Sequence, residues 1–250
     1  MKKIGLAQMN VEYGNMQKNV AVGKALINSA KEQKCDLVLL PELWSSGFDY
    51  HHLDDATENN CLLINYLQEI SDISGITICG TFIEKQDSQF FNSFNTFQPK
   101  FTRIRYYKNH LFARMHEDDY FTAGEAPIPF KSILGKTGMS ICYDLRFPEL
   151  FLNLRLHETE IFLMSAHWPL SRINHWDVLL QARAIENQAY MIAVNSVGQS
   201  GNDIYGGHST VIAPDGEILF RAPADKEGLF VVDIDPGKVK DLRQYFVIRS

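Results

Sequence analysis

The sequence contains few cysteines, and none of them has the spacing expected of a metal site or of a disulfide framework. Only four cysteines occur among 250 residues, and no two of them form a C-x-x-C pair. A chain of this length can bury a large core without disulfide bonds. We therefore expect four free thiols and no zinc site.

Long apolar runs are also missing. No stretch approaches the length of about 20 apolar residues that crosses a membrane. The opening "MKKIGLAQMN" has two lysines and then an apolar run that is too short for the core of a signal peptide. These absences favour the cytoplasm as the location.

Positive charge is scarce as well. The chain has 24 Lys and Arg against 30 Asp and Glu, which gives a formal net charge of −6. Nucleic acids and anionic membrane surfaces reward clusters of Lys and Arg, so neither is expected as the main partner. With 45% hydrophobic residues, the composition is that of an ordinary globular protein. We therefore expect a small-molecule substrate.

Strand-like and helix-like patterns alternate along the chain. Short apolar strands at 3–11 and 35–42 flank a helical pattern that begins after the N-cap candidate Asn15, and a second helix covers Leu63 to Ile70. A β-rich run follows at 76–107, in which alternating Phe and polar residues indicate a half-buried strand rather than a binding stripe. Helices are predicted near 148–156 and 172–187, and strands at 159–166, 189–197, 208–222 and 228–234. No repeat or linker interrupts the chain, so we predict one α/β domain over residues 1–250.

The stretch "GMSICYDLRFPEL" raises the question of whether Cys142 is a nucleophile. Strand-like alternation precedes Cys142, and Pro148 suits the first turn of a helix. A thiol near a helix N-terminus would be favoured as the thiolate. Free cysteine is also among the most buried residue types, so this segment alone leaves both interpretations open.

Glu42 and Lys108 strengthen the interpretation as a nucleophile. Like Cys142, each follows an apolar strand, and ligands of α/β sheets gather at the carboxyl ends of strands. A carboxylate could accept the thiol proton, the sulfur could attack a carbonyl carbon, and an ammonium could stabilise the developing oxyanion. Each charged residue alone could simply be solvated, but the three together form a coherent catalytic set.

Several motifs, in order along the chain, resemble those of the nitrilase superfamily of carbon-nitrogen hydrolases. They are "PELWSSGF", "YYKNHLF", "ICYDLRFPEL", "SAHWP", "HWDVLLQARAIENQAYMIAVNSVG", "GGHSTVIAPDGEIL" and "LRQYFVIRS". The resemblance implies a four-layer α-β-β-α sandwich and a homodimer. It also implies that Glu42 is the general base, that Lys108 and the backbone N–H of Tyr143 stabilise the oxyanion, and that Cys142 is the nucleophile. A second active-site glutamate would be Glu117, with Asp118 and Asp119 as adjacent rivals.

The residues around the cysteine indicate a branch of this superfamily. Cys142-Tyr143-Asp144 stands where true nitrilases usually have Cys-Trp-Glu, and the motifs look most like those of bacterial ω-amidases. The resemblance implies hydrolysis of the terminal amide of 2-oxoglutaramate or 2-oxosuccinamate through a Cys142 thioester, without a metal or organic cofactor. Deaminated-glutathione amidase and N-carbamoyl amidase are alternatives within the superfamily. A non-enzymatic interaction module that keeps the fold is the alternative outside it.

The substrate carboxylate of an ω-amidase requires a cation, and the planar fork of arginine matches a carboxylate. Arg172 follows the strand that ends at Ala166, so it is our main candidate, whereas Arg146 could instead brace the turn after Cys142. Arg183 and Glu186 are three residues apart on a helix, which predicts a structural ion pair. Three histidines could suggest a Cys-His protease, but Glu42 already provides a base, so we expect structural hydrogen bonds from His110, His167 and His208.

Overall fold

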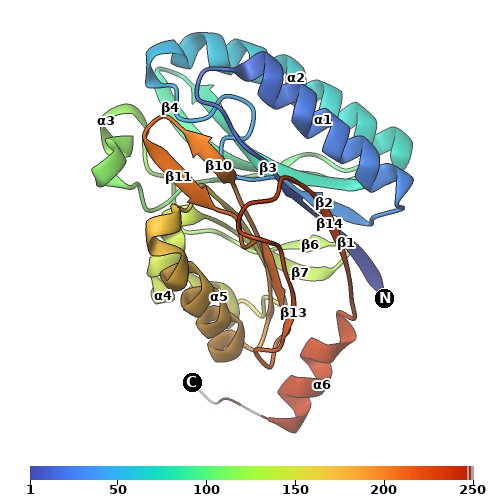
Figure 1. Ribbon diagram of the computed structural model, residues 1–250. Coiled ribbons are helices and arrows are strands. Elements are labelled where there is room, and N and C mark those ends of the chain that lie inside the picture. The colour runs from blue at the N-terminus through green and yellow to red at the C-terminus, as the bar shows by residue number, and fades with distance from the viewer. Residues whose placement is uncertain (247, 249–250) are drawn as a thin grey trace.

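Two six-stranded sheets form the centre of the computed structural model, which describes residues 1–246 and 248 (Figure 1). The first sheet has the order β14 (Gly228–Ile234), β1 (Lys2–Gln8), β2 (Leu37–Leu39), β3 (Thr77–Gln86), β4 (Gln89–Phe97) and β5 (Ile104–Tyr107). The second has the order β13 (Ile218–Arg221), β12 (Thr210–Ile212), β9 (Tyr190–Asn195), β8 (Ile161–Ala166), β7 (Gly135–Ile141) and β6 (Phe130–Ser132). A separate hairpin pairs β10 (Val197–Ser200) with β11 (Asp203–Gly206).

Helices cover the outer face of each sheet (Figure 1). The first sheet is covered by α1 (Met16–Glu32) and α2 (Leu53–Ser74), and the second by α4 (Pro148–Leu156) and α5 (Ile173–Asn187). The short α3 (Glu117–Tyr120) and the C-terminal α6 (Gly237–Tyr245) lie outside these layers. None of the described helices is both long and apolar enough to cross a membrane.

Three apolar layers hold this sandwich together. Side chains from both sheets, among them Leu39, Phe94 and Leu163, pack between the sheets. A second layer around Trp44 joins the first sheet to α1 and α2, and a third around Trp176 joins the second sheet to α4 and α5. The central strands of each sheet run parallel and are buried on both faces, which explains their almost continuous apolar sequences. The predicted four-layer α-β-β-α sandwich is confirmed.

Local sequence signals explain how α1 begins and how closely it packs. The Asn15 side chain accepts a hydrogen bond from the Lys18 backbone N–H at 3.3 Å, so Asn15 is the predicted N-cap. Gly23 faces the Trp44 ring, and a Cβ atom at this position would lie only 2.3 Å from the ring. The helix can therefore approach the sheet this closely only with glycine at position 23.

Some predicted boundaries differ from the structure. The strand predicted at 35–42 contains only β2, because the chain turns at Glu42, and the strand predicted at 189–197 contains β9 and the first residue of β10. Cys142 begins a 3-10 helix, η3 (Cys142–Arg146), and α4 starts only at Pro148. The closing motif "LRQYFVIRS" lies partly outside the described residues.

Candidate functional site

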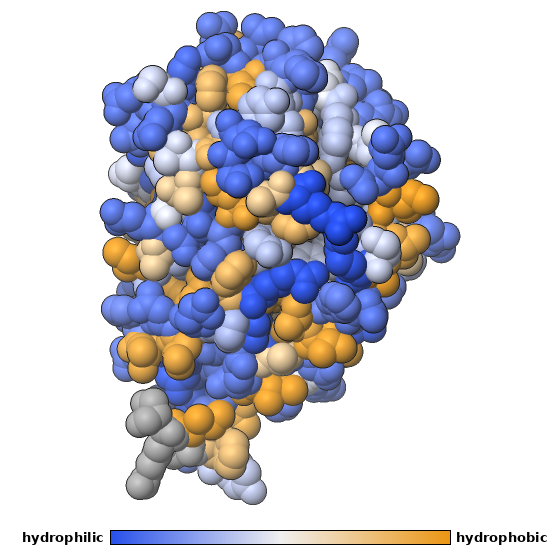
Figure 2. Space-filling model, turned by 90° about the vertical axis from the view of Figure 1, so that its left-hand side faces the viewer, coloured by the Kyte–Doolittle hydropathy of each residue, from blue (hydrophilic) through white to orange (hydrophobic). Residues whose placement is uncertain are grey.

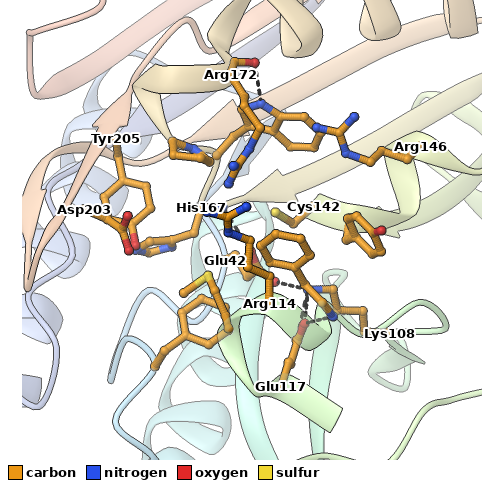
Figure 3. Close-up of a pocket in the computed structure, with 16 residues that line it drawn as sticks. Glu42, Lys108, Arg114, Glu117, Cys142, Arg146, His167, Arg172, Asp203 and Tyr205 are labelled. Atoms are coloured by element: carbon orange, nitrogen blue, oxygen red, sulfur yellow. Dashed lines mark hydrogen bonds and ion pairs between the residues drawn. The ribbon is translucent and has the colours of Figure 1, made fainter.

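Glu42, Lys108 and Cys142 lie together at one end of the sandwich (Figure 3). Glu42 comes shortly after β2, whereas Lys108 and Cys142 directly follow β5 and β7. The two sheets are joined at this end, since the Ser165 hydroxyl at the end of β8 donates to the Leu40 carbonyl at 2.8 Å. The three predicted residues therefore come from both sheets and meet between their carboxyl ends.

A buried network of charges forms the floor of the site. Lys108 Nζ lies 2.7 Å from Glu42 Oε1 and 2.8 Å from Glu117 Oε2, and all three side chains are at most 1% exposed. Burial raises the pKa of the Glu42 carboxyl, Lys108 opposes the shift and Glu117 adds to it. Burial would lower the pKa of Lys108, but Glu117 and Glu42 outweigh it and raise that pKa well above its ordinary value. Lys108 is therefore held as a cation between the two glutamates.

Glu117 is the second glutamate of this network, as the motif comparison predicted. It also accepts a hydrogen bond from the Phe112 backbone N–H at 2.8 Å. Its neighbours Asp118 and Asp119 are exposed and do not contact Lys108 in the described part of the chain. Among these rivals, only Glu117 belongs to the floor of the site.

Asn92 on β4 is a member of the network that sequence reasoning missed. Its amide Nδ2 donates to Glu42 Oε1 at 2.8 Å and to Glu117 Oε1 at 3.1 Å. It holds both carboxylates through one amide nitrogen, and its own side chain is fully buried. The only signal in the sequence was its polar position within the Phe-rich strand.

Cys142 has an unusual backbone conformation. Its φ of 43° lies in the left-handed region that non-glycine residues rarely adopt, and such strain is concentrated at functional sites. Burial, followed by the charge of Glu42, raises the pKa of the Cys142 thiol well above its ordinary value, although Lys108 opposes this. The predicted stabilisation of a resting thiolate is therefore wrong. The reason is that the sulfur is buried and that the Glu42 carboxyl group lies beside it.

The turn after Cys142 is held by two buried side chains. Asp144 Oδ2 accepts hydrogen bonds from the Ile141 backbone N–H at 2.9 Å and from the Tyr106 hydroxyl at 2.7 Å. Arg183 donates from Nη2 to the Leu145 carbonyl at 3.0 Å. These contacts keep the strained conformation in place, and neither role was predicted from the sequence.

The predicted structural interactions of the remaining polar residues are present. Arg183 and Glu186 form an ion pair at 2.9 Å. His110 Nδ1 bonds to Asp144 Oδ1 at 2.9 Å, and His208 Nδ1 bonds to Asp177 Oδ2 at 3.0 Å. The four cysteines are all free thiols.

A cavity with an empty volume of about 700 Å³, including the part that opens to solvent, lies above the buried floor. Figure 2 shows strongly hydrophilic side chains around a hollow in this face of the molecule. Three arginines line the cavity, each from a different 3-10 segment: η2 (Ala113–Met115), η3 and η4 (Leu170–Arg172). They are Arg114, Arg146 and Arg172, and within residues 1–246 and 248 none of them has a carboxylate partner.

Aromatic rings, rather than carboxylates, hold two of these arginines. The guanidinium of Arg146 lies 4.7 Å from the Trp168 ring centroid, and that of Arg172 lies 5.8 Å from the Phe112 ring centroid. Arg146 therefore does not brace the turn after Cys142, as the sequence had suggested, but faces the cavity. Arg114 was missed, although it is the only Lys or Arg between Lys108 and Glu117.

Residues 3–244 match the model of the carbon-nitrogen hydrolase family, and the chain belongs to this family. It is 34% identical to the 2-oxoglutaramate amidase of Bacillus subtilis over 96% of this chain and 93% of that protein. It is 32% identical to the omega-amidase YafV of Escherichia coli over 84% of this chain and 82% of that protein. The structure of XC1258 from Xanthomonas campestris superposes with a TM-score of 0.91 at 28% identity, covering 98% of this chain and 94% of that one.

These similarities confirm the predicted superfamily and its ω-amidase branch. The protein is an amidohydrolase, so the interpretation as a non-enzymatic interaction module is wrong.

Proposed function

We propose that this enzyme hydrolyses the terminal amide of a small carboxylate-bearing molecule, with 2-oxoglutaramate or 2-oxosuccinamate as the substrate. The observation that carries the proposal is a single arrangement of charges. A buried Glu42–Lys108 pair lies beside Cys142 at the floor of the cavity, and the arginines around it have no carboxylate partner among the described residues. The similarity to proteins named 2-oxoglutaramate amidase and omega-amidase supports this choice of substrate.

The first half of the reaction forms a thioester. Because the pKa of the Cys142 thiol is raised, the sulfur does not ionise on its own, and Glu42 takes its proton as the amide carbon is attacked. Lys108 and the backbone N–H of Tyr143 stabilise the negative oxygen of the tetrahedral intermediate. Glu42 then gives the proton to the leaving nitrogen, the carbon–nitrogen bond breaks and ammonia departs.

The second half releases the acid. Glu42 removes a proton from water, and the resulting hydroxide attacks the thioester carbon. The carbon–sulfur bond breaks, the sulfur recovers a proton from Glu42, and the product leaves as a carboxylic acid that gives its own proton to the solvent. Glu117 keeps Lys108 in place, since its carboxylate contacts Nζ through both oxygens at 2.9 and 2.8 Å.

Arginines of the cavity bind the distal carboxylate in this proposal. Arg172 and Arg114 extend toward the space beside Cys142, and Arg146 lies on the other side of the sulfur (Figure 3). We assign the carboxylate to Arg172, with Arg114 as a second donor, and keep Arg146 as a further substrate contact. A guanidinium without a carboxylate partner can give both of its parallel N–H groups to a substrate.

A panel of amides tests this proposal with purified protein. We expect ammonia release from 2-oxoglutaramate and 2-oxosuccinamate to be at least ten times faster than from the neutral amide butyramide at equal low concentration. Deaminated glutathione, an N-carbamoyl amino acid and a simple nitrile complete the panel. Faster turnover of the nitrile, or equal rates for neutral and carboxylate-bearing amides, would contradict the proposed substrate.

We further propose that residues 1–250 act as one domain that forms a cytoplasmic homodimer. Several apolar side chains on the outer helix layer are between about half and two-thirds exposed, and a second copy would bury them: Leu152, Leu156, Val178 and Ile185. A two-fold interface of this kind is the commonest closed arrangement. Light scattering should give the mass of two chains, and a monomer at micromolar concentration would contradict the assembly.

A further inference from the structure

His167 leaves a buried polar atom without a partner in the wall of the cavity. The residue directly follows β8, and its side chain is almost fully buried. Its Nδ1 lies 3.0 Å from the Ser196 hydroxyl, whereas Nε2 has no hydrogen-bond partner among the described residues. Native structures rarely leave a buried ring nitrogen unpaired. A ligand in the cavity is therefore a natural partner for Nε2.

The surroundings of His167 keep its ring uncharged. Burial lowers the pKa of His167 to about 3, so the imidazole is neutral at physiological pH. Aromatic rings surround it, with centroid distances of 5.7 Å to Phe48 and 4.5 Å to Tyr205. The Ser196 hydroxyl can donate to or accept from Nδ1, so Nε2 can carry either a proton or a lone pair. A neutral ring of this kind suits an uncharged oxygen better than a carboxylate.

The position of His167 indicates which part of the substrate it meets. Figure 3 shows His167 on the same side of Cys142 as Arg114 and Arg172, and Arg146 on the other side. If the arginines hold the distal carboxylate as proposed above, His167 lies beside that end of the substrate. Its backbone N–H also donates to Glu42 Oε2 at 3.0 Å, so the residue contacts both the floor and the wall of the cavity.

We propose that His167 is a specificity-determining residue that hydrogen-bonds, through Nε2, an uncharged oxygen on the carbon next to the substrate carboxylate. The oxygen is that of a carbonyl or a hydroxyl group. The enzyme would thus select amides of 2-oxo or 2-hydroxy acids over amides of unsubstituted acids. This inference rests on the proposed function, because it requires a carboxylate-bearing amide in the cavity.

Three substitutions distinguish the role of Nδ1 from that of Nε2. His167→Asn places an amide near the position of Nδ1, where it can bond to Ser196, and removes the atom at Nε2. His167→Phe keeps a ring and removes both nitrogens, whereas His167→Gln places an amide near the position of Nε2. His157→Asn on the exposed end of α4 is the matched control.

The measurement is kcat/KM for 2-oxoglutaramate, 2-hydroxyglutaramate and unsubstituted glutaramate, by ammonia release. We expect the ratio of an oxygen-bearing amide to glutaramate to fall about 10- to 100-fold in His167→Asn and His167→Phe, the scale of one lost hydrogen bond with a buried partner. His167→Gln should recover most of the ratio, and His157→Asn should keep it. A fall for one oxygen-bearing amide alone identifies the group that is recognised.

Two results would overturn the inference. One is a ratio that the Asn and Phe variants leave unchanged, and the other is an equal loss for all three amides, which would mean that the ring only packs. Thermal unfolding checks each variant, and if one loss variant does not fold, the other decides. If the proposed function itself is wrong, the unsubstituted protein will hydrolyse none of the three amides faster than butyramide. This result distinguishes failure of the proposed function from failure of the inference.

Discussion

The floor and the rim of the cavity differ in how their charges are partnered. On the floor, Lys108 is at most 1% exposed and contacts two glutamates within 3 Å. On the rim, Arg114, Arg146 and Arg172 are partly or largely exposed and have no carboxylate partner in the described chain. A buried charge needs a partner from the protein itself, whereas water solvates a guanidinium at the cavity mouth until the substrate binds. In the proposed mechanism the floor therefore serves the reaction, and the rim serves the choice of substrate.

The largest expected effect comes from removing the sulfur on the floor. Cys142→Ala should reduce ammonia release from every amide by about 10⁴-fold or more, the scale for losing a nucleophile. The fold should persist, because alanine leaves the bonds of Asp144 in place. Steady-state assays and thermal unfolding measure both effects. Cys61→Ala, an exposed position on α2, is the control, and residual turnover above 1% in Cys142→Ala would exclude Cys142 as the nucleophile.

A smaller and selective effect is expected on the rim. Arg172→Leu should lower kcat/KM for 2-oxoglutaramate by about 30- to 1000-fold, which corresponds to about 2–4 kcal/mol for truncating one partner of a charged pair. Butyramide has no carboxylate, so its hydrolysis should change little. Arg155→Leu, on α4 outside the cavity, is the control. An equal loss of kcat/KM for both amides would show that Arg172 shapes the cavity and does not bind the substrate carboxylate.

The smallest expected effect is a shift in the pH dependence of kcat/KM, which depends on both glutamates of the floor. If Glu42 acts as a base, as we propose, kcat/KM should be lost as the pH falls through its pKa, and burial places that midpoint above the ordinary value of 4.5. Glu117→Gln removes a negative neighbour that raises this pKa, so the midpoint should move to lower pH. His167 stays neutral over this range and adds no titration.

Initial rates between pH 4 and 8 (roughly the span in which enzymes titrate such groups) measure the midpoint, and samples returned to neutral pH exclude acid unfolding. A midpoint at or below 4.5 in the unsubstituted protein would contradict the burial of an ionised Glu42.

Much of the fold could be predicted because its signals are local. The apolar strands and the Asn15 cap appear where expected, although the strand predicted at 208–222 is divided into β12 and β13 by a turn that a 2.9 Å bond from the Gly216 N–H to the Ala213 carbonyl closes. The boundary of β2 and the 3-10 form of η3 could not be predicted. Both depend on contacts from distant segments, such as Arg183 at the Leu145 carbonyl.

The sequence by itself determined the chemistry of the floor. Glu42 and Cys142 follow the parallel strands β2 and β7, Lys108 follows the edge strand β5, and the carboxyl ends of these strands lie at the same end of the sandwich. Only the tertiary structure decided the pKa values of these groups and which side chains surround the cavity. The raised pKa of the Cys142 thiol arises from burial and from the Glu42 charge, and Glu42 is 100 residues earlier in the chain. Arg114 lies between β5 and β6, whereas His167 and Arg172 lie between β8 and α5, and only the tertiary structure brings these two segments to the same cavity.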